Sequence, residues 1–184
     1  MYRIMLVDDE ENILNALRRV LVSDFDHEGQ TYQLTVETFS VPKEALKRAE
    51  DMAFDLVISD FRMPVMNGVE FLKAFRKIQP NSSRMILSGY TDLDGLLGAI
   101  NEAQIYRFIN KPWNDFDLKS AIAQALTYRG LIMENERLAD LVRVQQGQLS
   151  KQEIALKQLE AESPGITKVN WGPDGSVILN EEDM

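Results

Sequence analysis

Short apolar runs alternate along the first 126 residues with stretches whose apolar residues are spaced as on one face of a helix. The runs are residues 4–7, 34–39, 56–58, 85–87 and 106–109. Short apolar runs rich in β-branched residues are typical of strands buried on both faces of a parallel sheet. Strict alternation of strands and helices predicts an α/β fold, here a five-stranded, parallel, doubly wound sheet with helices on both faces.

Two stretches that connect predicted strands need separate interpretation. Ser23–Gln33 is polar and is predicted to be a long loop. It contains the only histidine, His27, which has no partner in the sequence pattern and is given no catalytic role. Asp92 is suited to cap a helix through Leu93–Ile100.

Composition narrows the class of protein. The 184 residues are 45% hydrophobic and 27% charged, which suits one soluble domain with an appendage. No apolar run reaches the ~18–20 residues of a membrane span, and the first strand begins too early to leave room for a signal peptide. The chain has no cysteine, which suits a cytoplasmic protein. A net charge of −9 argues against a nucleic-acid surface.

Polar residues follow four of the predicted strands: Asp8, Asp9, Asp60, Ser88 and Lys111. In a parallel sheet the carboxyl ends of the strands meet at one edge, where such folds bind ligands. Three crowded carboxylates either raise a pKa or recruit a cation, and Mg²⁺ is the cation that best suits oxygen ligands. An ionised Asp60 beside such a cation can act as a nucleophile and form an acyl phosphate.

Each of these residues also has an ordinary interpretation by itself, as a helix cap, a loop hydroxyl or a turn. Their joint placement at one edge favours a site. The segments IMLVDDEE (Ile4–Glu11), SDFRMP, LSG and NKP resemble the receiver domain of bacterial two-component response regulators, over residues 1–128. The resemblance implies that Asp60 accepts a phosphoryl group from a sensor histidine kinase or a phosphotransfer protein. It also implies that the domain is not an enzyme beyond its own phosphorylation and dephosphorylation.

The resemblance assigns roles to the site residues. Asp9 and Asp60 would bind Mg²⁺ directly, together with the backbone carbonyl of Arg62, and Asp8 would act through a metal-bound water. Lys111 would pair with the phosphate, and the peptide bond that follows it, to proline, is expected to be cis.

Phosphorylation is expected to move two further side chains. Ser88 would shift toward the phosphate, and Phe108, which matches the switch aromatic of the family, would turn into the space that this shift frees. Arg62 departs from the family pattern, which commonly has a smaller Asn there, so it bears on the lifetime of the phosphorylated state.

Residues 129–162 contain no proline and repeat apolar positions in heptads. The predicted dimerisation residues are Leu131, Asn135, Leu138, Val142, Leu149, Leu156 and Leu159. This pattern favours a coiled-coil homodimer, and an Asn at an a position suits a parallel pair. A continuous helix over 115–162 would be about 70 Å long. The alternative is a single amphipathic helix folded back on the receiver.

Residues 163–184 are predicted to form a β-hairpin around Gly172–Gly175, anchored by Trp171. An isolated hairpin is marginal in water, so a disordered tail is the alternative.

Three functions remain open at this point. The first is a phosphorylated switch that signals through coiled-coil dimerisation and an unknown downstream protein, with no DNA-binding or nucleotide-cyclase motif in the sequence. The second is a Mg²⁺-dependent phosphatase that works through an aspartyl phosphate, and the third is a dimerisation scaffold that does not switch. The segment Ile105–Trp113 resembles receivers that precede phosphodiesterase or transcription-activator domains.

Overall fold

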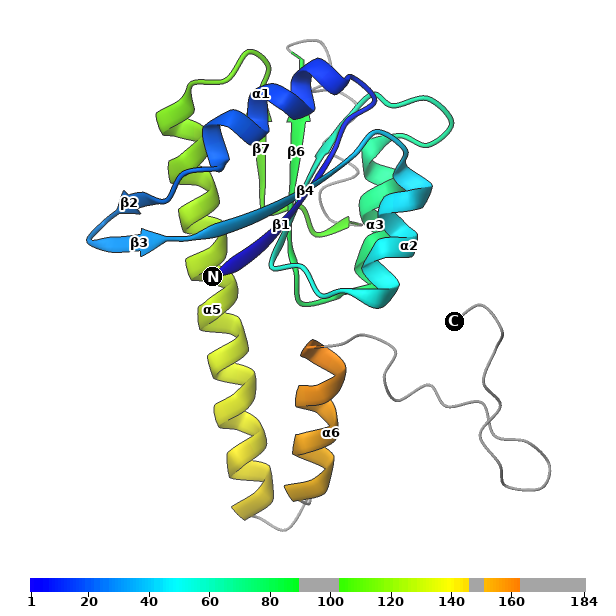
Figure 1. The fold of residues 1–184 in the computed structure, drawn as a ribbon. Coiled ribbons are helices and arrows are strands. Elements are labelled where there is room, and N and C mark those ends of the chain that lie inside the picture. Colours follow the sequence, from blue (N-terminus) through cyan, green and yellow to red (C-terminus); the bar gives the residue numbers. More distant parts are fainter. Residues whose placement is uncertain (90–102, 146–150, 163–184) are drawn as a thin grey trace, which may run out of the picture.

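One parallel sheet carries the fold in the computed structural model, which describes residues 1–89, 103–145 and 151–162. The strand order is β4-β1-β5-β6-β7. The strands are β1 (Tyr2–Val7), β4 (Leu34–Phe39), β5 (Leu56–Asp60), β6 (Ser83–Ser88) and β7 (Arg107–Asn110). All four pairings are parallel, which confirms the predicted five-stranded sheet (Figure 1).

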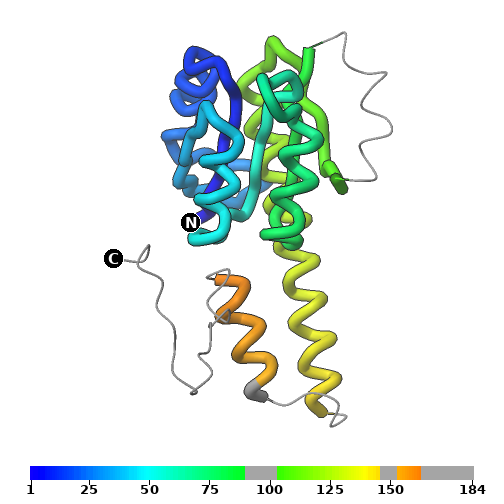
Figure 2. The backbone as a smooth tube through the Cα atoms, turned by 90° about the vertical axis from the view of Figure 1, so that its right-hand side faces the viewer, coloured from blue at the N-terminus to red at the C-terminus, as the bar shows by residue number. Residues whose placement is uncertain are grey.

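Helices cover both faces of this sheet (Figures 1 and 2). The helices of the described receiver are α1 (Glu11–Leu21), α2 (Pro42–Asp51), α3 (Gly68–Ile78) and α5 (Asp115–Gln145). Side chains alternate across each strand, so Ile4 packs with α1 and α5 while its neighbour Met5 packs with α2 and α3. Two apolar cores on opposite sides of the sheet hold the strand ends in place.

The turn after β5 brings helix α3 back close to the strand end. Asn67 caps α3: its side chain accepts from the Glu70 amide at 2.9 Å, and the Glu70 carboxylate accepts from the Asn67 amide at 3.1 Å. The Gly68 amide donates to the Phe61 carbonyl at 2.9 Å. These bonds fix the loop that borders Asp60.

Residues 23–33, predicted to be a loop, contain a small antiparallel hairpin of β2 (Phe25–His27) and β3 (Gln30–Tyr32). Glu28 and Gly29 both have positive φ, 51° and 80°, which suits a two-residue hairpin turn. The loop prediction is therefore wrong here. Tyr32 stacks between Tyr2 and Phe25, and its hydroxyl lies 2.8 Å from the Thr127 hydroxyl, so the hairpin braces α5.

The helical extension is folded rather than straight. α5 continues past the receiver to Gln145, and α6 (Lys151–Glu162) lies beside the lower part of α5 (Figures 1 and 2). Lys157 Nζ lies 2.9 Å from Asp140 Oδ2, whereas one continuous helix would hold these residues about 25 Å apart along its axis. In this single chain, residues 115–162 therefore do not form one straight helix, and α6 folds back beside α5.

Several predicted features lie outside the described residues: the helix through Leu93–Ile100, Leu149, and the hairpin within residues 163–184. Among the described helices, none is long and apolar enough to cross a membrane.

Candidate functional site

Three carboxylates converge at the carboxyl ends of two neighbouring strands. Asp8 and Asp9 follow β1, and Asp60 ends β5. The two strands pair in parallel, with Val7 opposite Ser59, so the residues that follow meet at one edge. One carboxylate oxygen from each of the three acids lies within 4.8 Å of the others. The structure thus brings together the acids that the sequence predicts as one group.

Lys111 reaches this group from the end of β7, the edge strand of the sheet. It follows β7, and its Nζ atom lies 2.7 Å from Asp8 Oδ2 and 2.5 Å from Asp60 Oδ1. Its amide donates to the Ser88 carbonyl at 2.8 Å, which fixes the start of its loop. The Lys111–Pro112 peptide bond is cis, as the sequence predicts.

Burial and charge act against each other in this cluster. Asp8 is 1% exposed, and burial raises the pKa of its carboxyl more than the hydrogen bonds from Lys111 and the Glu10 amide lower it. Burial also disfavours the Lys111 ammonium, but its hydrogen bonds to Asp60 and Asp8 outweigh this and raise the pKa of Lys111. The site therefore holds more negative charge than one ammonium balances, which suits an added cation.

The second oxygen of Asp60 is held by the backbone. Its Oδ2 accepts a hydrogen bond from the Arg62 amide at 2.8 Å. Behind the strand end, a Cβ atom on Gly68 would overlap the carbonyl oxygen of Asp60. Only glycine fits there, a role that sequence reasoning missed although the glycine stands in the motif MPVMNG.

Ser88 completes the edge from β6, the strand next to Asp60. Its side chain is 1% exposed, and its Oγ is buried without a hydrogen-bond partner among the described residues. A buried hydroxyl without a partner is costly, so this atom is available to a group that enters the site. Phe108, half-buried on β7, pairs with Ile86, so Phe108 and Ser88 lie on the same face of the sheet.

The donor set fits a hard divalent cation. Carboxylate oxygens are the ligands that Mg²⁺ prefers, and the three acids lie close enough to share one ion. Asp9 is exposed, which leaves one side of the group open to water and to a substrate. The role of the Arg62 carbonyl as a ligand stays a prediction.

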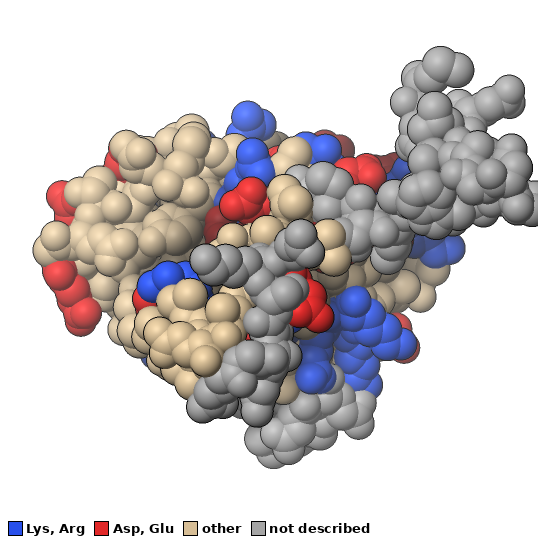
Figure 3. Space-filling model, turned by 90° about the horizontal axis from the view of Figure 1, so that it is seen from below, with Lys and Arg blue, Asp and Glu red and all other residues tan. Residues whose placement is uncertain are grey.

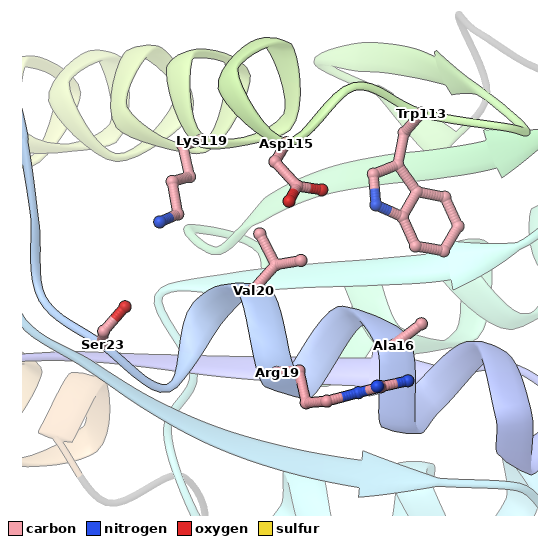
Figure 4. A pocket seen from close by; sticks show the side chains of 7 residues that line it. All are labelled: Ala16, Arg19, Val20, Ser23, Trp113, Asp115 and Lys119. Atoms are coloured by element: carbon pink, nitrogen blue, oxygen red, sulfur yellow. The ribbon is translucent and has the colours of Figure 1, made fainter.

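A separate pocket of about 470 Å³ lies between α1 and the start of α5, beside Trp113 (Figure 4). Arg19 lines it from α1 and Lys119 from α5, and Asp115 lies between Lys119 and Trp113 in this view. None of the predicted site residues lines it. The predicted site at the acidic edge is therefore separate from this pocket.

An ion pair that the sequence did not predict holds α5 at the amino end of β5, away from the acidic edge. Arg129 Nη1 lies 2.7 Å from Asp55 Oδ1, and its Nε donates to the Asn81 carbonyl at 3.0 Å. The helical extension thus starts from a fixed position at the base of the sheet.

The predicted dimerisation residues that the structure describes, a set that leaves out Leu149, are exposed in the single chain. Leu131 is 61%, Leu138 47%, Val142 50%, Leu156 56% and Leu159 48% exposed. Asn135 is also exposed. The structure leaves these six residues open to solvent, and pairing with a second chain stays a prediction.

Comparison with known proteins places this geometry in a family. Residues 4–123 match the family described as response regulator receiver domain. The chain is 34% identical over 181 residues to the hydrogenase transcriptional regulatory protein HoxA of Bradyrhizobium diazoefficiens, a match that covers 98% of this chain and 34% of HoxA. The chain spans about a third or less of the length of the first curated relatives it matches.

Two solved structures are similar in fold. One is the signal receiver domain of an HD domain-containing protein from Pseudomonas fluorescens Pf-5, with a TM-score of 0.63 and 33% identity, covering 70% of this chain and 97% of that one. The other is described as an adenylate cyclase from Rhodopirellula baltica, with a TM-score of 0.67 and 36% identity, covering 76% and 97%.

Proposed function

The chain belongs to the response regulator receiver domain family, and on that premise we propose that it is a cytoplasmic signalling switch phosphorylated on Asp60. The donor would be a phosphohistidine on a sensor histidine kinase or a phosphotransfer protein. An Asp60 carboxylate oxygen attacks phosphorus, the bond from phosphorus to the imidazole nitrogen breaks, and an acyl phosphate forms. The histidine recovers a proton from water.

The observation that carries this proposal is the Ser88 hydroxyl. It is buried on the strand next to Asp60 and has no partner among the described residues. A phosphoryl oxygen on Asp60 would supply the missing acceptor. The same event frees Lys111 from its bond to Asp60, so its ammonium is available to the phosphate.

Asp8, Asp9 and Asp60 are the residues that would hold Mg²⁺. When bound, the ion offsets negative charge on the phosphoryl group. Lys111 would offset further charge on the phosphoryl group, and the Arg62 amide orients the Asp60 carboxylate. These residues prepare the site for a dianionic group.

The output is proposed to pass through the sheet edge and the helical extension. Movement of Ser88 would open space for Phe108, which is half-buried on the adjacent strand. The exposed heptad residues of α5 and α6 would pair two chains. A downstream protein would bind the changed surface.

A second candidate for the output is control of transcription. The similarity to HoxA covers 98% of the chain and so extends through both helices beyond the receiver. HoxA is named as a transcriptional regulatory protein. We infer that this chain, with its helices, transmits the phosphorylation signal to gene expression.

The test is intact mass after incubation with acetyl phosphate and Mg²⁺, with Asp60→Asn as the control. We expect one phosphoryl adduct on the wild type and none on the variant or after treatment with EDTA. A folded wild-type chain that binds Mg²⁺ and shows no adduct, even at the shortest quenched times, would contradict the proposal.

A further inference from the structure

The extension presents its leucines on the side away from its own internal contact. In α5, Asp140 and the half-buried Met133 face α6 and the hollow beside it. At 3.6 residues per turn, Leu131, Leu138 and Val142 lie roughly 160–180° around the helix from Asp140. All three are at least 47% exposed. The fold-back therefore does not bury these three apolar residues of α5.

The same holds for α6. Lys157 and the half-buried Ile154 face α5 and the hollow, whereas Leu156 and Leu159 are 56% and 48% exposed. Leu159 lies roughly 160° around the helix from Lys157. The leucines of the two helices thus point to opposite outer sides of the folded extension.

Contact between α6 and the rest of the chain is loose. A hollow of about 820 Å³ remains between the two helices and the base of the receiver, lined by residues such as Ile78, Pro80, Met133 and Ile154. Well-packed interiors leave few voids larger than a water molecule. Figure 3 shows charged side chains of both signs on the face seen from below. In the Lys157–Asp140 ion pair the lysine side chain is 57% exposed, and a pair with an exposed partner contributes little to stability.

The sequence spacing fits a different arrangement. Leu159 follows Leu131 by four heptads, and no proline interrupts residues 128–162. In one continuous helix, the outer leucines of α5 and α6 would fall on a single seam, with Asn135 at an a position. A seam of this kind is complementary to itself, so the partner that fits it is a second copy of the chain.

We propose that α6 is a reversible clasp, which leaves α5 and continues it as one helix when two copies of the chain pair in parallel through the joined leucine seam. The inference rests on the dimer in the proposed function and adds how it forms. Folded back, α6 keeps the seam in two separate halves and disfavours pairing. Released, it offers the full seam to the second copy.

Spin-label distances test the clasp directly, because the chain has no cysteine and accepts labels only where they are introduced. Glu136→Cys and Ala161→Cys place labels at two exposed positions that line the same hollow. We expect a short distance in dilute, monomeric protein and about 37 Å, at 1.5 Å per residue, in the concentrated dimer. Labelled chains are diluted with unlabelled protein so that distances between subunits do not contribute.

A charge reversal on α6 should shift the equilibrium from the folded-back monomer toward the dimer. Lys157→Glu places a like charge beside Asp140 and should lower the dimer dissociation constant, measured by light scattering, by about two- to fivefold. Lys43→Glu changes the net charge equally at an exposed site on α2 and should leave the constant unchanged. Leu138→Gln should weaken the dimer at least tenfold, whereas Val22→Gln, equally apolar and 70% exposed on the receiver, should not.

A distance that stays short in the dimer overturns the clasp, and so does a chain that remains monomeric even with Lys157→Glu. The mass assay for Asp60 on the same labelled protein is independent of both results. Loss of the phosphoryl adduct would therefore count against the proposed switch, and a short distance in the dimer would count against the clasp alone.

Discussion

Gly68 packs so closely behind Asp60 that a Cβ atom at residue 68 would overlap the Asp60 carbonyl oxygen and come within 3.0 Å of its carbonyl carbon. The Gly68 amide also donates to the carbonyl of Phe61, the next residue after Asp60. The start of α3 and the end of β5 therefore share a space that only glycine leaves free. The position of Asp60, the proposed phosphoacceptor, depends on this contact.

Gly68→Ala should push the backbone of Asp60 away from its present position. We expect phosphorylation by acetyl phosphate to slow by at least about tenfold, because small displacements of reacting groups are costly. Overpacking should also lower the free energy of unfolding by about 1–3 kcal/mol. Quenched-flow mass spectrometry and chemical denaturation measure the two effects.

Gly130→Ala is the matched control. A Cβ at Gly130 meets no atom within 4 Å, and the residue lies inside α5. This variant should be about 1 kcal/mol more stable than the wild type, with an unchanged rate of phosphorylation. Equal rates for both variants would remove the proposed link between Gly68 and Asp60.

Two serines at opposite ends of β6 make a second matched pair. Ser83 Oγ donates to the Ala125 carbonyl at 3.0 Å, whereas Ser88 Oγ is buried without a partner among the described residues. Ser83→Ala should lower the free energy of unfolding by about 1 kcal/mol, and Ser88→Ala should leave it equal or higher. In contrast, only Ser88→Ala should weaken binding of beryllofluoride, a mimic of the phosphoryl group. Equal destabilisation by both variants would mean that Ser88 is satisfied in the free protein.

The sheet and the acidic edge could be predicted from the sequence because parallel strands bring their carboxyl ends to one side. Once 4–7 and 56–58 are recognised as strands, Asp8 and Asp60 must meet if these strands are neighbours. The hydrogen bonds of Lys111 follow from the same geometry. The local sequence was therefore enough to predict that the acids and Lys111 lie at one edge of the sheet.

Other features depend on contacts that no local pattern contains. Strands of three residues, such as β2 and β3, are held by the stacking of Tyr32 on Tyr2 and by its contact with Thr127, which are distant in sequence. The Glu28-Gly29 pair was the one local signal for this hairpin. For α6, the heptad pattern indicates an apolar face but does not say whether the helix next to it belongs to the same chain.

Val65 stores local strain in the loop beside the site. Its φ is 71°, a conformation that β-branched residues rarely adopt, and its side chain is 94% exposed. Val65→Gly should raise the free energy of unfolding by roughly 1 kcal/mol, because glycine adopts this conformation without a steric penalty. Val41→Gly, at φ −119° before α2, should lower it instead. Chemical denaturation measures the free energy of unfolding of both variants. A lower value in both variants would show that Val65 is not strained.

Lys111→Met should destabilise the metal-free protein in a way that depends on pH. The substitution leaves the carboxylates of Asp8 and Asp60 without their ammonium partner. Breaking a fully buried pair costs about 3–5 kcal/mol, and we expect about 2 kcal/mol at pH 7.5 because the Lys111 side chain is 20% exposed.

The sign of the pH dependence follows from Asp8. Burial already raises its pKa, and loss of Lys111 removes hydrogen bonds that lower it. An acid whose pKa is raised in the folded state binds its proton more tightly there than in the unfolded chain. Its ionisation therefore lowers the free energy of unfolding at high pH, and this loss fades as the pH falls. The raised pKa of Lys111 adds stability at every pH below about 10.5 and so gives no slope in this range. The deficit of Lys111→Met, measured by denaturation in EDTA, should therefore shrink between pH 7.5 and pH 4.5, whereas Lys43→Met should show a small and constant difference. A deficit of the same size at both pH values would mean that Lys111 stabilises the fold by packing and not by holding the charge of Asp8.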